Sequence, residues 1–83
     1  MLRKRLLYAS QRRGMRELDL ILGPFAEANL EGFSEDELQA YQQMLEYPEV
    51  VLYDWLVRGI PVSSTEPENV RQMAQRILRY FGN

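Results

Sequence analysis

The chain has 83 residues, of which 46% are apolar and 27% are charged, with a net charge of −2. This length and composition predict one domain with a real core, a charged surface and little stability to spare. The absence of cysteine excludes disulfides and thiolate metal sites, and the absence of histidine excludes a serine–histidine hydrolase and an ordinary zinc site.

The net charge conceals a segregation of charges along the chain. Residues 1–16 carry six basic side chains and no acid, residues 17–57 carry ten acids and no base, and residues 58–83 carry four bases and two acids. Such segregation indicates oriented binding or complementarity within the fold. No apolar run approaches the roughly 20 residues of a membrane-spanning helix, so we expect no insertion into a membrane.

The first expected helix covers about residues 2–13 and has Leu2, Leu6 and Ala9 on its apolar stripe. Gly14 interrupts it, either as a C-terminal cap or as a weak point between two helices.

A second helix is expected to begin near Met15 and to end before Gly32. Pro24 must break or kink this helix, because proline lacks the amide hydrogen and its ring clashes with the preceding turn. The apolar spacing resumes after Pro24, which favours a kink. The apolar face comprises Leu18, Ile21, Leu22 and Phe25.

The third expected helix opens at Ser34, with Glu37 in the position of a capping box, and ends where Pro48 follows Tyr47. Its buried stripe is expected to comprise Leu38, Tyr41 and Leu45. A short fourth helix follows from Pro48 or Glu49 to Val57, and its inward side chains are expected to be Val51, Leu52, Trp55 and Leu56.

The last expected helix has Thr65 as its cap, Pro67 in its first turn and Glu68 completing a second capping box. Its apolar residues form the clearest helical stripe in the chain and are expected to be core; they are Val70, Met73, Ala74, Ile77, Leu78 and Phe81. No segment alternates convincingly like a strand. The sequence therefore predicts an all-α protein, a compact five-helix bundle in which residues 1–83 form a single domain.

The stretch from residue 11 to residue 19 is the strongest candidate for a functional site. Gly14 permits a sharp turn and a close approach by another backbone. The arginines around it offer forked donors for carboxylates or phosphates, and the two acids that follow offer acceptors. The candidate residues are Arg12, Arg13, Gly14, Arg16, Glu17 and Asp19, with Tyr8 one turn before them.

A structural role explains part of this stretch equally well. If Gly14 separates two helices, Arg13 lies in the last turn of one and Glu17 in the first turn of the next, where both suit the helix dipole. In a continuous helix they form an i, i+4 pair instead. The residues alone leave these readings open.

The run from Arg13 to Glu17 resembles the RGxxE signature of the FAD assembly factors of succinate dehydrogenase, known as flavinators. Arg13, Gly14 and Glu17 match the signature positions. The resemblance extends over about residues 8–59; its further parts are Leu18-Asp19, Pro24-Phe25, residues 34–38, residues 45–48 and residues 52–56. Residues 49–51 depart from the acidic, proline-containing run that family members often have, so the resemblance is weaker in the fourth expected helix.

The resemblance implies a chaperone that binds the flavoprotein subunit of succinate dehydrogenase, and often of fumarate reductase, and promotes its covalent FAD attachment. The flavin is bound to a histidine of the partner, and this chain has no histidine to offer. We therefore expect a non-catalytic protein that binds no cofactor covalently and docks through its Arg13–Glu17 surface. We further expect a monomer in a bacterial cytoplasm, rather than in a mitochondrial matrix.

Other readings remain for several residues. Arg3, Lys4 and Arg5 belong to a solvated helix face or attract an acidic partner. Trp55 is a core residue or an interface anchor. The rival function is nucleic-acid binding by the basic first helix, which the ten-acid middle segment opposes by repelling a polyanion. An enzyme would need Glu17 and Asp19 as an acid–base pair, yet side chains two apart on a helix do not face each other.

Overall fold

The computed structural model describes residues 2–82, and within them the regular secondary structure consists of five α-helices and one 3₁₀ turn. The elements are α1 (Leu2–Gln11), α2 (Arg16–Asn29), the 3₁₀ turn η1 (Leu30–Gly32), α3 (Glu35–Leu45), α4 (Glu49–Leu56) and α5 (Glu68–Gly82). The prediction of a compact all-α, five-helix bundle is confirmed. Met1 and Asn83, the ends of the expected domain, lie outside the described residues.

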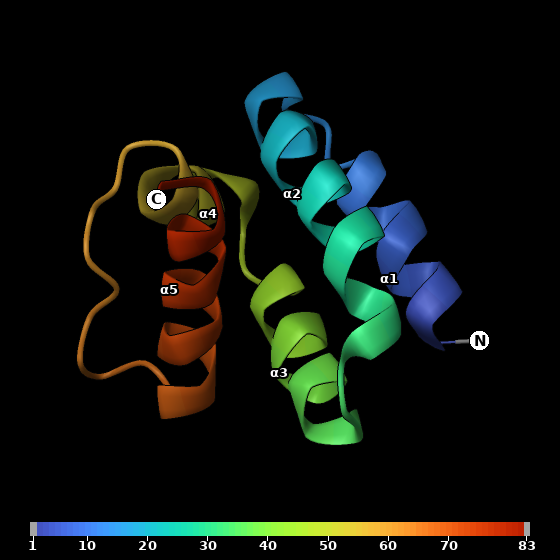
Figure 1. Cartoon of the computed structure of the whole chain (residues 1–83). Helices are drawn as coiled ribbons and strands as arrows, with labels where there is room; N and C mark the ends of the chain where they lie inside the picture. Colours follow the sequence, from blue (N-terminus) through green and yellow to red (C-terminus); the bar gives the residue numbers. More distant parts are fainter. Residues whose placement is uncertain (1, 83) are drawn as a thin grey trace.

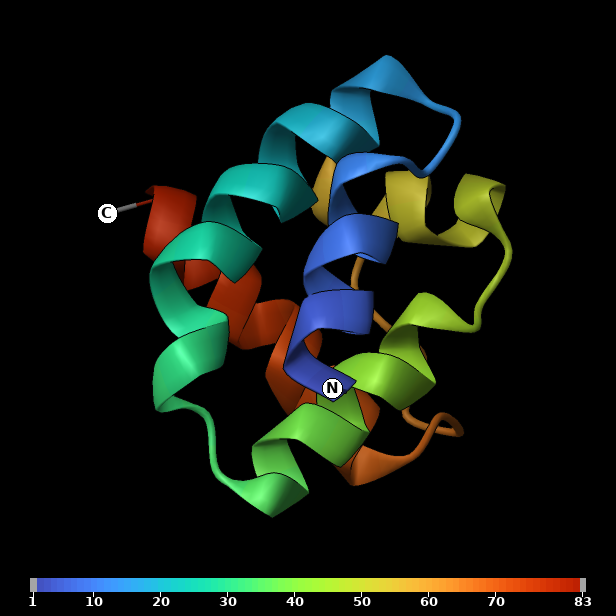
Figure 2. The ribbon, with the colours of Figure 1, turned by 90° about the vertical axis from the view of Figure 1, so that its right-hand side faces the viewer.

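The helices pack as two pairs joined by the short α4. Figure 1 shows α1 beside α2 at one side of the molecule and α5 at the other, with α3 between them, and Figure 2 gives the same arrangement from the side. Helix α4 contacts both α2 and α5. Each helix buries one stripe in a common core; its fully buried large side chains include Leu18, Leu22, Phe25, Leu38, Tyr41, Met44, Leu52, Val70 and Ile77.

Three aromatic rings lie at the centre of this core. Phe25, Phe33 and Tyr41 have ring centroids 6.0–6.2 Å apart. The Tyr41 hydroxyl lies 2.6 Å from Oγ of Ser10, which donates in turn to the Leu6 carbonyl at 2.7 Å. Ser10 is fully buried and was absent from the expected stripe of the first helix, because a serine carries no apolar signal.

The first two helices meet as two separate rods. Helix α1 ends at Gln11, two residues before the expected end, and Gly14 has φ +96°, which no helix contains. Gly14 is therefore a joint between helices, as one of the two readings held. Helix α2 continues through Pro24, whose side chain is exposed, and ends before Gly32 as expected.

One of the two expected capping boxes is present. Ser34 and Glu37 exchange both hydrogen bonds, so the prediction for α3 is confirmed. The second box is wrong: Thr65 pairs with Ser63 in a turn, and α5 begins only at Glu68. The carbonyl of Pro67 accepts the first helical hydrogen bonds, so proline occupies the place assigned to the cap.

The stripe of α5 is buried only as far as Ile77. Val70, Met73, Ala74 and Ile77 are buried, whereas Leu78 and Phe81 are 38% and 47% exposed, so their assignment to the core was wrong. Helical spacing shows which face is apolar but not how far the neighbouring helices cover it. Trp55 is buried against Tyr47, which confirms its reading as a core residue.

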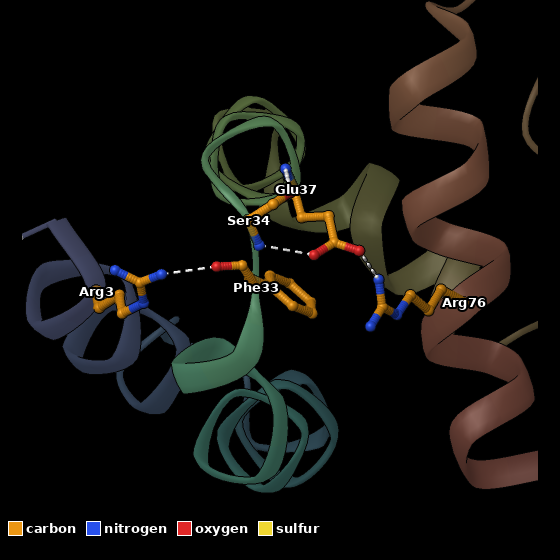
Figure 3. Close-up of polar contacts among 5 residues, drawn as sticks. All are labelled: Arg3, Phe33, Ser34, Glu37 and Arg76. Carbon is orange, nitrogen blue, oxygen red and sulfur yellow. Dashed lines mark hydrogen bonds and ion pairs between the residues drawn. The ribbon is translucent and has the colours of Figure 1, made fainter.

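A chain of polar contacts joins α1, α3 and α5 at one end of the bundle (Figure 3). Arg3 donates to the backbone carbonyls of Leu30 and Phe33, at 3.1 and 2.6 Å. These carbonyls lie just after α2 and just after η1, so Arg3 supplies hydrogen bonds to the C-terminal ends of both elements. Glu37 caps α3 through Ser34 and also accepts from Arg76 at 2.6 Å. The guanidinium of Arg76 lies 4.5 Å from the centroid of the Phe33 ring. Arg3 therefore has a structural role, which neither reading of the basic first helix included.

Candidate functional site

The bend between α1 and α2 has Gly14 at its exposed tip. A φ of +96° is strained for any residue with a side chain, so glycine is required for the turn itself. A carboxylate oxygen of Glu49, the first residue of α4, lies 3.0 Å from where a Cβ on Gly14 would stand. The bare backbone of Gly14 thus allows this acid to approach the bend.

Asp19 holds the bend from within the first turns of α2. Its Oδ1 accepts the backbone N–H of Arg13 at 2.7 Å, and the side chain is half-buried. Its own backbone N–H donates to the Met15 carbonyl at 3.0 Å, which starts the helix. Asp19 was expected at the partner surface, but its carboxylate binds the chain's own backbone.

Arg13 points inward, toward the junction of α3 and α4. Nη2 donates to the Tyr47 carbonyl at 3.5 Å, and Nε is buried without a hydrogen-bond partner among the described residues. Burial raises the pKa of Tyr41 to about 12, while the Ser10 hydrogen bond and the charge of Arg13 act in the opposite direction. The guanidinium of Arg13 thus links the bend to the α3–α4 junction, and only part of this side chain faces solvent.

The remaining sequence-predicted residues lie on the outside. Arg16 and Glu17 are exposed in the first turn of α2, and no hydrogen bond within residues 2–82 engages the Glu17 carboxylate. Tyr8 is 61% exposed, with the guanidinium carbon of Arg12 lying 4.3 Å from its ring centroid. We call these residues the bend surface: Tyr8, Arg12, Gly14, Arg16 and Glu17.

Sequence reasoning missed one exposed apolar neighbour of the bend surface and one acid. Leu20 is 61% exposed and follows Glu17 by three residues on the outer face of α2. Leu20 could have been found by its absence from the buried stripe. Glu49 could not, because nothing local indicates that α4 begins beside Gly14.

The family description "flavinator of succinate dehydrogenase" belongs to a family model that matches residues 4–81. The chain belongs to this family. The assignment agrees with the resemblance carried by the run from Arg13 to Glu17, all of which lies inside the matched range.

Curated relatives support the family over most of this chain. Succinate dehydrogenase assembly factor 2, mitochondrial, of Dictyostelium discoideum is 36% identical over 74 residues, 89% of this chain and 52% of that protein. The protein of the same name in Caenorhabditis briggsae is 43% identical over 82 residues, 94% of this chain and 64% of that protein. The FAD assembly factor SdhE of Coxiella burnetii is 33% identical over 66 residues, 80% of each chain.

The chain spans about half to two thirds of the length of these two mitochondrial relatives. The relatives occur both in mitochondria and in a bacterium, and they are named as assembly factors, in agreement with the expectation of a non-catalytic protein. No solved structure matches the chain.

The described residues contain neither a candidate metal site nor a candidate membrane-spanning helix. Within residues 2–82, no three acidic side chains gather as metal ligands would, and none of the helices has the length and apolarity to cross a bilayer.

Proposed function

We propose that this protein binds the flavoprotein subunit of succinate dehydrogenase through the bend surface and thereby promotes the covalent attachment of FAD to that subunit. The observation that supports this most strongly is the exposure of Gly14 and Glu17 together. A glycine has no side chain to block an approaching backbone, and the Glu17 carboxylate has no hydrogen-bond partner among the described residues, so both are open to another protein. Arg16 and Tyr8 flank them with a donor and an aromatic ring.

The contribution of this chain is to position its partner. It has no histidine, and the acid nearest to Glu17 in sequence, Asp19, holds the backbone of Arg13. We propose that docking stabilises the conformation in which the partner's own residue meets the flavin, an effect of proximity and orientation that needs no catalytic group from the helper. FAD is bound by the partner, and this chain carries none covalently.

The test is flavinylation of the isolated flavoprotein subunit in the presence of FAD. Covalent flavin is read by fluorescence of the denatured subunit in a gel, and binding is read by retention of the FAD-free subunit on the immobilised protein. We expect Glu17→Ala to weaken retention and to slow flavinylation at least several-fold. The melting temperature should fall only slightly, because Glu17 is exposed and contributes to the stability of residues 2–82 only through the dipole of α2, by about 0.3–1 kcal/mol.

The matched control is Glu31→Ala, which removes an exposed acid just beyond the opposite end of α2. It should behave as the wild type. Equal loss in both variants would mean that net charge and not the bend surface governs docking. Normal flavinylation by Glu17→Ala would refute the proposal.

We extend the proposal to the flavoprotein subunit of fumarate reductase, to be tested in the same assay with that subunit as substrate. We place the protein as a monomer in a bacterial cytoplasm, and sedimentation of the free protein tests the first of these. One contact weakens the nucleic-acid alternative. Arg3, one of the cations of the basic first helix, is engaged by the carbonyls of Leu30 and Phe33.

A further inference from the structure

A second surface lies well apart from the bend. A groove of about 320 Å³ runs between the segment of residues 59–64 and the outer face of α5. Figure 1 shows this segment bowing out beyond α5, at the side of the molecule away from α1 and α2. Six of the residues lining the groove are Ile60, Pro61, Val62, Arg71, Ala74 and Leu78.

The groove is apolar and open. Ile60 is 40% exposed and Leu78 is 38% exposed, although both are large aliphatic residues. Phe81 follows Leu78 by three residues and extends the same helix face beyond the groove. Clustered apolar side chains of this kind mark surfaces that bind another molecule, whereas single ones need no explanation.

The walls of the groove are held in place. The N–H of Ile60 donates to the Asp54 carbonyl at 2.9 Å, which attaches the start of the segment to α4. Beyond its other end, Glu66 accepts from the Tyr47 hydroxyl at 2.5 Å, and its carbonyl accepts from Nε of Arg71 at 3.1 Å. A groove with walls held at both ends binds its occupant without a large ordering cost.

The charge of the groove is positive. Arg71 is its one charged lining residue, and no acid of the described chain lines it. The Arg71 guanidinium bonds only to a backbone carbonyl within residues 2–82, so its charge is uncompensated by a carboxylate there. The complement of this surface is an apolar side chain followed by an acidic group.

We propose that this groove binds an extended segment of the same flavoprotein subunit, one that presents an apolar side chain next to a carboxylate. The inference rests on the proposed function. About nine residues of extended chain equal the longest dimension of the molecule, 31 Å, so a partner that presents an extended segment can contact both the bend surface and the groove.

The test is the affinity of the FAD-free flavoprotein subunit for variants of this chain, measured by calorimetry at two salt concentrations. Leu78→Glu should weaken binding about tenfold, as expected for a central apolar contact. Arg71→Gln should weaken it several-fold at low salt and less at high salt, because the lost interaction is between charges. The matched controls on exposed positions of α5 outside the groove are Gln72→Glu and Arg79→Gln, and both should bind as the wild type.

Three outcomes would overturn the proposal. If Glu17→Ala weakens binding while both groove variants bind normally, the groove has no role and the proposed function stands. If the wild type does not bind the subunit at all, the proposed function itself fails. If sedimentation shows a wild-type dimer that Leu78→Glu converts to a monomer, the occupant is a second copy of the chain. If Leu78→Glu has a much lower melting temperature than the wild type, Ile60→Ser, on the opposite wall of the groove, is tested in its place.

Discussion

Oδ1 of Asp19 accepts the backbone N–H of Arg13 at 2.7 Å, so an acid of α2 holds the bend that precedes it. Glu17, two residues earlier, is exposed and engages no group within residues 2–82. Two acids in one turn therefore have separate roles. Asp19 maintains the shape of the bend, and Glu17 is open to a partner. Substituting them one at a time separates the stability of the bend from its docking.

Replacing Asp19 with alanine should destabilise the fold by about 1–2 kcal/mol, because it leaves the half-buried amide of Arg13 without an acceptor. A change of this size lowers the melting temperature of a domain this small by about 4–16 °C. Thermal unfolding followed by circular dichroism measures the effect, with Glu17→Ala as the control, which removes an acid from the same helical turn and should lower the melting temperature less. Equal melting temperatures for the two variants would show that Asp19 does not hold the bend.

Replacing Gly14 with alanine should cost about 1–2 kcal/mol, because a residue with a Cβ is strained at φ +96°. The added Cβ also meets the Glu49 carboxylate, which must move aside. Urea unfolding measures the cost. Gly32→Ala is the control, since a Cβ there meets no atom within 4 Å and the backbone has no positive φ. A neutral Gly14→Ala would mean that the bend relaxes freely. Gly14 variants combine strain with any docking effect, so Glu17 is the cleaner probe of function.

Most of the fold could be predicted from local patterns. The capping box at Ser34, the break at Pro48 and the stripes of α2 and α3 are determined by residues within one or two turns of each other. The end of α1 was placed two residues too late. The backbone N–H of Arg13 bonds to the Asp19 side chain and not within α1, and local helical spacing does not indicate this contact. The false cap at Thr65 has a similar cause. Its hydroxyl had a competing partner in Ser63.

The place of the bend could be predicted, but not the role of each residue around it. A glycine between arginines and acids indicated a helix end or a weak point between two helices, and Gly14 forms a bend. The sequence could not show that Arg13 turns inward, since its contact with Tyr47 joins residues 34 positions apart. For the same reason Glu49 was missed beside the bend. Long-range packing decides which charged side chains stay at the surface.

Tyr41 should make the protein less stable at alkaline pH. Burial raises its pKa from 10.0 to about 12, so the folded state disfavours the charged phenolate. The contribution of the neutral hydroxyl is complete below pH 10.0 and is lost as the pH rises toward 12. Tyr41→Phe removes the hydrogen bond to Ser10, so its free energy of unfolding at neutral pH should be about 1 kcal/mol lower than that of the wild type. Above pH 10.0 the stability of this variant should decline less than that of the wild type.

Urea unfolding between pH 8 and pH 11 measures this difference. Tyr53→Phe is the control, because the Tyr53 hydroxyl makes no hydrogen bond within residues 2–82 and the variant should decline as the wild type does. An alkaline decline of the same slope in Tyr41→Phe would show that Tyr41 ionises without opposing the fold.

Glu37 should contribute stability at neutral pH that the protein loses in acid. The backbone N–H of Ser34 and then the Arg76 guanidinium hold its pKa below the ordinary 4.5. A carboxyl with a lowered folded-state pKa contributes stability that is fully present above its unfolded pKa and is lost as the pH falls through the folded one. The wild type should therefore lose this contribution below about pH 4.5, whereas Glu37→Gln, which lacks it at neutral pH, should show a shallower acid decline.

Glu35→Gln removes an exposed acid from the same turn of α3 and is the matched control, expected to retain the wild-type acid decline. Urea unfolding at closely spaced values between pH 3 and pH 6 compares the three proteins. Parallel curves for Glu37→Gln and the wild type would mean that the capping bond and the Arg76 pair form equally well with the protonated carboxyl. In that case the contact between α3 and α5 would owe its stability to the packing of Arg76 on Phe33 and not to charge.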